Sequence, residues 1–250
     1  MRNYLSLTPF VLATILASFA NAHTQLYGIE GPDGSFEQGK YIIPSSMGNA
    51  PVVGDAILTD SLRCRSASMS TTGIDALDVT AGDDVTFRYY HKATSQYSNS
   101  PVMSRSHMGP CTAYMAPVSS KGDGKSWFKV FYEGYDADEK KWCTTKVIDN
   151  NGDFVFTVPK DIPSGLYYAR TELFAIHQAT ASSSIQMYPG CALINVVNGG
   201  SFEPTELGAI PGIYNNADDP GLTWTRGQDP TKYPGLPGPE LYNATTGASS

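Results

Sequence analysis

His23 holds the position in this chain that most clearly suggests metal chemistry. Residues 1–22 have the pattern of a secretory signal peptide, with a positive charge at Arg2, a mostly apolar run over 5–19 and a small-x-small cleavage site at 20–22. Cleavage after residue 22 would make His23 the N-terminal residue. Its α-amino group and its imidazole could then close a chelate ring on one metal ion. Position alone does not exclude the alternative, a solvated terminal histidine.

His107 is a second candidate ligand. It lies in the segment Ser-His-Met-Gly-Pro, a predicted turn immediately before a strand that begins at Cys111. Ligands are common at such strand ends because the sheet fixes the direction of the loop. Taken alone, a histidine in such a turn is more often a surface residue.

A predicted hairpin brings a third histidine close to two further polar side chains. Two strands are joined by a polar turn centred between Ala181 and Ser182, which places His177 opposite Gln186. The two-residue period of a strand then puts Tyr188 on the same face as Gln186. The alternatives are a polar face in solvent, or a tyrosine packed in the core with its hydroxyl bonded.

These residues need a scaffold of strands, because helical periodicity is nearly absent from the chain. Short alternating runs are separated by clusters of glycine, proline, asparagine and aspartate, which favour turns. The predicted strands are 84–90, 111–118, 127–132, 152–158, 166–176 and 185–197. Their number and spacing indicate an all-β fold, an antiparallel β-sandwich of the immunoglobulin or fibronectin-III type with long ordered loops.

We expect one folded domain over 23–244, preceded by the signal peptide 1–22 and followed by a flexible stub over 245–250. From Gly199 onward the composition shifts to glycine, proline, asparagine, aspartate, tyrosine and tryptophan. Because large aromatic side chains are costly to leave in water, a long loop packed along the sandwich is favoured over a linker.

The charge of the chain argues against two classes of partner. A formal net charge of −7 disfavours nucleic acid and anionic membrane surfaces, which attract clusters of lysine and arginine. A neutral polysaccharide is compatible with it. Beyond the signal peptide, no apolar run approaches the roughly 20 residues that a membrane-spanning helix needs. The four cysteines of a secreted chain imply two disulfides with three possible pairings, and none has zinc-site spacing.

A set of short motifs occurs in order over nearly the whole mature chain. They are His23 at the cleaved N-terminus, Leu62-Arg63-Cys64, Ser106-His107-Met108-Gly109-Pro110 with Tyr114-Met115-Ala116, Trp127-Phe128-Lys129, Gly165-Leu166-Tyr167-Tyr168-Ala169-Arg170-Thr171-Glu172 with Ala175-Ile176-His177, Gln186-Met187-Tyr188-Pro189-Gly190-Cys191, Asp219-Pro220-Gly221, and Tyr233 followed by Pro237-Gly238-Pro239. Each motif is weak alone. The ordered set resembles the fungal lytic polysaccharide monooxygenases of auxiliary activity family 9, formerly grouped with the glycoside hydrolases.

The resemblance implies one copper ion per chain, held in a histidine brace. His23 would supply its amine and one ring nitrogen, and His107 the third nitrogen. Tyr188 would stand at a long axial position, and His177 and Gln186 would be hydrogen-bonding groups beside the metal. Three nitrogens with a weak axial oxygen suit Cu(II), which leads the affinity order for divalent ions. An α-amine has a pKa of about 8, so a tightly held metal can displace its proton near neutral pH.

The resemblance also implies the disulfides Cys64–Cys191 and Cys111–Cys143, the second of which is not general in the family. Thr171 is a further departure, since the family often has histidine there, and this position concerns support of the hairpin more than the chemistry.

Two tyrosines are candidates for contact with a sugar ring. Tyr233 lies in a stretch rich in proline and glycine, where an exposed ring could be held rigid at little entropic cost. The alternative is that it packs the C-terminal loop onto the sandwich. Tyr41 is a weaker candidate, and core packing is its alternative.

With these features, the resemblance implies a secreted, monomeric copper monooxygenase. It would cleave cellulose or a related β-1,4-glucan at C1 or C4, using O2 or H2O2 and a small-molecule or protein electron donor. The alternatives are a copper-binding protein without activity, which needs no oxygen-positioning groups such as His177 and Gln186, and a carbohydrate-binding sandwich, which needs no metal. A glycosidase would need two facing carboxylates, and no such pair stands out.

Overall fold

Two β-sheets form the scaffold in the computed structural model, which describes residues 23–243 apart from 67, 92–101, 217 and 225. The smaller sheet is antiparallel and has the order β1-β3-β8. Its strands are β1 (Gln25–Glu30), β3 (Asp84–Tyr90) and β8 (Asp153–Thr157). The predicted signal peptide 1–22 and the predicted stub 245–250 both lie outside the described residues.

The larger sheet has the order β11-β5-β4-β9-β10-β2 and is antiparallel except that β2 runs parallel to β10. Its strands are β2 (Leu77–Thr80), β4 (Cys111–Pro117), β5 (Lys125–Glu133), β9 (Gly165–Ala175), β10 (Gln186–Val197) and β11 (Gly208–Ala209). A separate small ribbon pairs β6 (Tyr135–Asp136) with β7 (Lys141–Trp142).

One apolar core lies between the two sheets. Leu26, Phe87 and Phe156 of the smaller sheet pack in the same buried cluster as Met115 and Leu173 of the larger sheet. This arrangement confirms the predicted β-sandwich. It also brings β1 against β10, next to the edge strand β2 of the larger sheet, where Gly190 faces Leu26.

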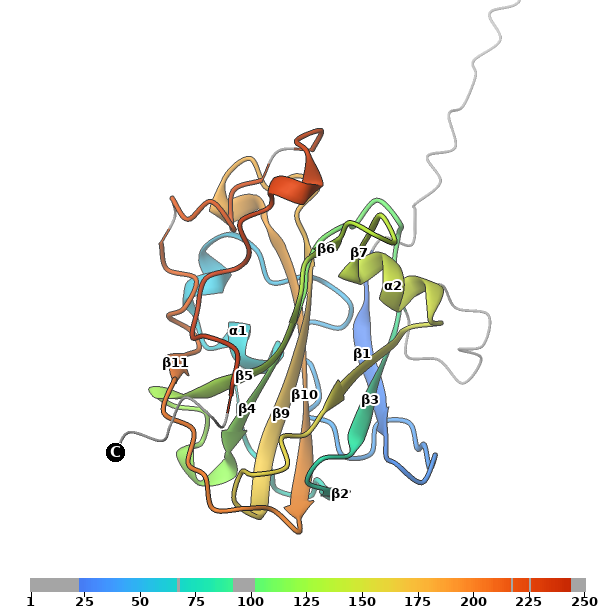
Figure 1. Ribbon diagram of the computed structural model, residues 1–250, viewed down its shortest axis with the longest axis vertical. Helices are drawn as coiled ribbons and strands as arrows, with labels where there is room; N and C mark the ends of the chain where they lie inside the picture. Colours follow the sequence, from blue (N-terminus) through green and yellow to red (C-terminus); the bar gives the residue numbers. More distant parts are fainter. Residues whose placement is uncertain (1–22, 67, 92–101, 217, 225, 244–250) are drawn as a thin grey trace, which may run out of the picture.

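A second apolar core covers the opposite face of the larger sheet. Phe174 and Met187 lie there with Trp127, against side chains from the loops such as Leu62 and Trp224. The C-terminal segment, orange to red in Figure 1, runs along the larger sheet rather than extending away from it. This placement agrees with the prediction of a packed loop, and it makes β9 and β10 apolar on both faces.

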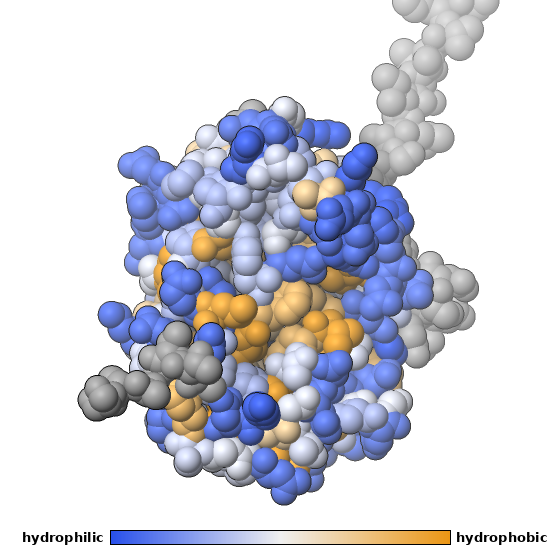
Figure 2. Space-filling model, in the orientation of Figure 1, coloured by the Kyte–Doolittle hydropathy of each residue, from blue (hydrophilic) through white to orange (hydrophobic). Residues whose placement is uncertain are grey.

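Short helices connect the strands. They are α1 (Ser61–Cys64), α2 (Cys143–Asp149), and the 3-10 turns η1 (Gly54–Leu58), η3 (Val118–Ser120), η4 (Ser182–Ser184) and η5 (Pro230–Lys232). No helix within the described part of the chain is long and apolar enough to cross a membrane. In the orientation of Figure 1, hydrophilic residues cover most of the surface and an apolar band crosses the middle (Figure 2).

Two disulfides fasten the loops to the larger sheet. They join Cys64 to Cys191 and Cys111 to Cys143, which are the pairs that the resemblance implied. The first ties α1 to β10, three residues beyond Tyr188. The second ties the start of β4 to α2, close to the turn that carries His107.

Candidate metal centre

Three histidines and a tyrosine meet at one end of the sandwich. The ring centroids of His23 and His107 are 6.2 Å apart, and the Tyr188 ring lies 6.2 Å from each of them. His177 packs against His107 with 4.5 Å between ring centroids. The structure therefore brings together side chains that are separated by up to 165 positions in the sequence.

The pairing of β4 with β9 explains why His107 and His177 meet. In this register Cys111 pairs with Leu173, and the pairing continues beyond β4 as Ile176 donates its backbone N–H to the Met108 carbonyl at 2.9 Å. The same register places His107 across from His177. The sheet thus sets the distance between the two imidazoles.

Gly109 allows this close pairing. A Cβ on Gly109 would lie 2.1 Å from the Phe174 carbonyl oxygen, which no side chain can tolerate. Its backbone also exchanges hydrogen bonds with α2, because its N–H donates to Thr144 Oγ1 at 2.9 Å and its carbonyl accepts from Thr144 N at 3.1 Å. A glycine at position 109 is therefore required by the approach of β9 and α2.

A second glycine lets β1 approach β10 and brings His23 to the site. A Cβ on Gly190 would lie 2.6 Å from the Leu26 Cβ. Because Gly190 leaves this space empty, the start of β1 can lie against β10 near Tyr188. His23 is two residues before β1, so it arrives over the same end of the strand.

Tyr188 is fully buried, and its hydroxyl donates a 2.8 Å hydrogen bond to Gln186 Oε1. The two side chains share one face of β10, as the two-residue period predicts. Met187 between them points to the other face, into the second core. The prediction that Gln186 and Tyr188 lie side by side is confirmed.

The predicted pairing of His177 with Gln186 is wrong by two residues. Gln186 pairs with Ala175, and β9 ends there, so His177 lies beyond the paired strands. The difference arises because the connection includes the 3-10 turn η4 and is wider than a symmetric hairpin centred between Ala181 and Ser182. A shift of two residues preserves which face each side chain occupies.

Burial lowers the pKa of all three imidazoles. The pKa of His107 falls to about 4, mainly by burial and then by the nearby His177 and His23, while the adjacent Gln186 acts in the opposite direction. Burial also lowers the pKa of His23 and of His177, with further contributions from the charges of His91 and Arg226 respectively. The rings are therefore neutral near pH 7 and keep a lone pair for a ligand.

The donor set fits copper if the amine of His23 is included. His107 Nε2 is buried and meets no hydrogen-bond partner among the described residues, as is also true of His177 Nδ1. Such orphaned nitrogens call for an explanation, and an absent ion is one. No three side chains of histidine, cysteine, aspartate or glutamate converge on a metal position in the described chain. The third nitrogen would have to be the α-amine of a processed His23.

Sequence reasoning missed His91, the fourth histidine. Its Nδ1 lies 2.7 Å from the His23 carbonyl oxygen, and Asn49 Nδ2 donates to the His91 carbonyl at 2.9 Å. His91 follows directly after the correctly predicted strand 84–90, but strand β1, against which that strand pairs, was not predicted. Without β1 the sequence offered no reason to place His91 beside His23.

Tyr233 lies within an aromatic cluster. Its ring contacts Trp142 and Trp224, with centroid distances of 5.1 and 5.3 Å, and its hydroxyl donates to the Gly221 carbonyl at 2.7 Å. These contacts are those that the packing alternative requires, and stacking on a sugar stays a prediction. Tyr41 is partly buried against the first core, and its carbonyl accepts from Leu193 N at 2.7 Å.

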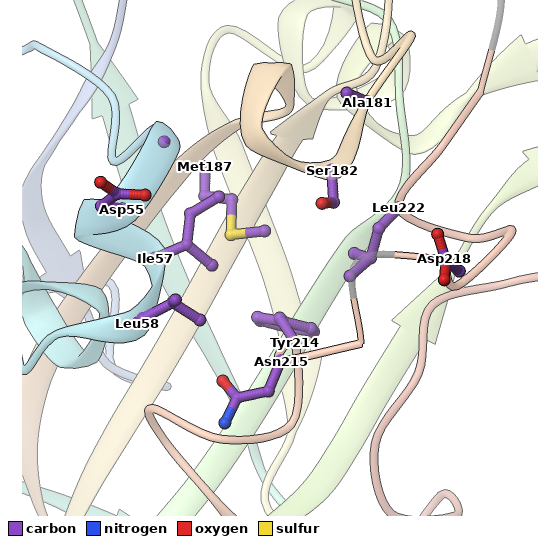
Figure 3. Close-up of a pocket in the computed structure, with 11 residues that line it drawn as sticks. Asp55, Ile57, Leu58, Ala181, Ser182, Met187, Tyr214, Asn215, Asp218 and Leu222 are labelled. Carbon is purple, nitrogen blue, oxygen red and sulfur yellow. The ribbon is translucent and has the colours of Figure 1, made fainter.

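A cavity of about 400 Å³ lies on the other face of β10 and is distinct from the histidine cluster. Figure 3 shows Met187 at its centre, with Asp55 of η1, Ser182 of η4 and Asn215 of the C-terminal loop around it. None of the predicted site residues lines it. The candidate centre is instead a cluster at the end of the sandwich.

Comparisons with known proteins relate this chain to one enzyme family. The family model described as Auxiliary Activity family 9 (formerly GH61) matches residues 21–233. A lytic polysaccharide monooxygenase A of that family from Aspergillus niger is 34% identical over 96% of this chain, which spans only 57% of that protein's length. One from Armillaria gallica is 33% identical over 96% of this chain and 95% of the relative.

A solved structure named CvAA9A has the same fold. It superposes with a TM-score of 0.78 and 28% sequence identity, over 89% of this chain and 99% of that one. The matched region extends from the predicted cleavage site to Tyr233 and so includes all the residues of the histidine cluster. This chain belongs to Auxiliary Activity family 9.

Proposed function

We propose that this chain is a copper-dependent polysaccharide monooxygenase that oxidatively cleaves β-1,4-glucan, with cellulose as the first substrate to test. The curated relatives of similar sequence are named lytic polysaccharide monooxygenases. The net charge of −7 suits a neutral polymer better than an anionic one.

The observation that carries the proposal is the pair of His23 and His107 over the Tyr188 ring. The two imidazoles are 6.2 Å apart, and His107 Nε2 is buried with no partner in the described chain. After cleavage of the signal peptide, the amine and imidazole of His23 and the imidazole of His107 would hold one copper ion. Tyr188 would offer a weak oxygen contact at most, because burial raises the pKa of its phenol and keeps that oxygen neutral.

Bound copper would supply one-electron redox chemistry with O2 or H2O2. Hydroxylation of a C–H bond by H2O2 releases one water and needs no further electrons, whereas O2 requires two electrons and two protons as well. The O2 route therefore needs an external electron donor, either a small molecule or a protein. The hydroxylated carbon, C1 or C4, would then eliminate and break the glycosidic bond.

We assign to His177 and Gln186 the role of orienting the oxygen co-substrate. The His177 ring packs on the ligand His107, and its Nδ1 has no partner within the described residues. The Gln186 amide oxygen accepts from Tyr188, which fixes the orientation of an amide that could also donate through its nitrogen. Preorganised donors of this kind stabilise charge that develops on oxygen.

We further propose that the protein is secreted and acts as a monomer after cleavage following residue 22. The apolar run and small-x-small site of the first 22 residues support secretion, and the two disulfides fit an oxidising compartment.

Mass spectrometry of products from cellulose, copper and ascorbate tests the proposal. Wild-type protein should release oxidised oligosaccharides, and His107→Ala should release none above the level of free copper. Tight copper binding without oxidised products would instead identify a copper-binding protein. Metal-independent binding to cellulose without products would identify a carbohydrate-binding module.

A further inference from the structure

The first two backbone carbonyls after the predicted cleavage site are each held by a side chain from another segment. The His23 carbonyl lies 2.7 Å from His91 Nδ1, and the Thr24 carbonyl accepts from Arg65 Nη1 at 2.8 Å. Chain termini are usually poorly ordered unless they are tied down. Here the restraint falls on the one residue that would supply two metal-binding nitrogens.

The position of His91 follows from the pairing of β1 with β3. Gln25 pairs with Tyr90, so His91 emerges beside the residues that precede β1. A carbonyl oxygen can only accept, and a contact of 2.7 Å therefore requires that His91 carry its proton on Nδ1. Asn49 Nδ2 then donates to the His91 carbonyl at 2.9 Å, and not to the protonated Nδ1, which is 3.3 Å away.

Arg65 is a rigid anchor for the next carbonyl. It is 1% exposed, and its Nη1 also donates to the Ala50 carbonyl at 3.1 Å. It follows Cys64, which the disulfide fastens to Cys191 of β10, and its backbone has the left-handed φ of 54°. The Thr24 carbonyl is therefore bound to the part of the chain that is fixed to the sheet carrying Tyr188.

With both carbonyls held, a processed His23 keeps few conformational degrees of freedom. They are rotation about its Cα–C bond and its side-chain torsions, which are the freedoms that chelation of a metal would remove. Restraining the rest beforehand lowers the entropy that binding must cost.

We infer that His91 is a positioning residue for the metal centre, which acts by holding the His23 carbonyl through Nδ1–H, with Asn49 as its support. The inference rests on the proposed function, because it takes His23 to be the chelating residue. Arg65 fixes the adjoining carbonyl and completes the restraint.

The test compares His91→Leu with His91→Asn in the processed protein. Leucine removes the donor, whereas the asparagine Nδ2 can occupy the place of the imidazole Nδ1. We expect His91→Leu to weaken Cu(II) binding by about 10–100-fold, the usual cost of losing an outer partner of a metal ligand, and to alter the Cu(II) electron paramagnetic resonance spectrum. His91→Asn should keep the wild-type spectrum and most of the affinity.

The hydrogen bond from His91 to the His23 carbonyl can also be tested in the metal-free protein, where the result does not depend on copper binding. In the metal-free processed protein, nitrogen-15 NMR should show the neutral His91 ring as the Nδ1–H tautomer. The Nε2–H tautomer would overturn the inference even if His91→Leu lost stability. A wild-type protein that binds no copper would refute the proposed function, whereas equal affinity and equal spectra for wild type and His91→Leu would refute only the role of His91.

Asn49→Ala and Asn195→Ala form a matched pair of controls. Each loses one amide donor, but Asn195 bonds Asp78 at 2.8 Å far along β10 from the site. We expect Asn49→Ala to weaken copper binding and to shift the spectrum toward that of His91→Leu. Asn195→Ala should leave both unchanged, and an equal change in the two variants would contradict the support assigned to Asn49.

Discussion

Two polar clusters on strand β9 differ in how completely their hydrogen bonds are satisfied. Arg170 and Glu172 are both fully buried, and they form two bonds of 2.7 and 2.8 Å with each other. Arg170 also donates to the carbonyls of Leu62 and Arg63, and Glu172 accepts from Tyr214. At the end of the same strand, by contrast, His107 Nε2 and His177 Nδ1 are buried and have no partner in the described chain.

The difference separates a structural cluster from a candidate site. Buried polar groups in folded proteins are almost always paired, so an unpaired one calls for a ligand or a role. The arginine–glutamate pair joins α1 and the C-terminal loop to the larger sheet and leaves little hydrogen-bonding capacity unused. The two imidazoles are kept neutral by burial and each keeps a ring nitrogen without a partner in the described chain, which leaves His107 able to bind a metal.

The largest expected effect is a loss of stability when the hydrogen-bonded pair of Arg170 and Glu172 is broken. Glu172→Gln leaves the buried Arg170 charge without a counter-charge, which should lower the free energy of unfolding by about 3–5 kcal/mol. Urea denaturation of the metal-free protein measures the loss. Glu37→Gln is the matched control, because its ion pair with Lys40 is exposed to solvent and should contribute little to stability. Equal losses in the two variants would remove the distinction between the clusters.

The next effect concerns copper rather than stability. His107→Ala should weaken Cu(II) binding by more than the roughly 10–100-fold typical of an outer partner, while His177→Ala should stay within that range and lower oxidative turnover. Both should cost less unfolding free energy than Glu172→Gln. Titration with Cu(II) and urea denaturation provide the two readouts. Loss of the metal in His177→Ala, with retention in His107→Ala, would reverse the assignment.

A smaller effect is expected on the pH dependence of stability. The pKa of His107 is about 4 in the folded protein and near 6.5 in a solvated chain, so the unfolded state binds more protons between these values. The contribution of His107 to the free energy of unfolding is therefore complete above pH 6.5 and is lost as the pH falls from 6.5 toward 4. When the free energy of unfolding of the metal-free protein is plotted against pH across this window, the slope should be smaller in His107→Ala than in the wild type. An unchanged slope would show that His107 does not titrate as its burial requires.

The smallest effect is predicted at Tyr114, beside the Arg170–Glu172 pair. Tyr114 packs beside Arg170, but its buried hydroxyl meets no partner in the described chain. Because burial of a hydroxyl without a partner is costly, Tyr114→Phe should leave the free energy of unfolding unchanged or raise it by about 1 kcal/mol. A loss of stability, measured by the same urea titration, would reveal a bond to the Tyr214 hydroxyl and a still more complete network.

The sequence predicted the longer strands of both sheets well, because their apolar runs are bounded by clear turn residues. The strand predicted over 84–90 matches β3, and the one over 166–176 differs from β9 by one residue at each end. Short elements were missed. Six-residue β1 and seven-residue α2 lack a repeated pattern of their own and are held by tertiary packing and by the Cys111–Cys143 disulfide.

The sequence indicated which residues form the candidate site, but not the residues that hold them in position. The motifs indicated His23, His107 and the Gln186–Tyr188 pair, since these depend on type and order along the chain. The register of His177 failed because a 3-10 turn lengthens the connection to β10. The contacts of His91 and Arg65 with the N-terminal carbonyls depend on where β1 lies in space. No local pattern around residues 91 or 65 carries that information.

Copper binding by two forms of the N-terminus tests the central claim most directly. One form begins at His23, and the other carries a single extra alanine before it, which turns the amine into an amide and a poor ligand. The account predicts one tightly bound Cu(II) per chain in the first form and an affinity at least about 100-fold lower in the second, which corresponds to nearly 3 kcal/mol. Equal affinity in the two forms would contradict the assignment of His23 as the chelating residue.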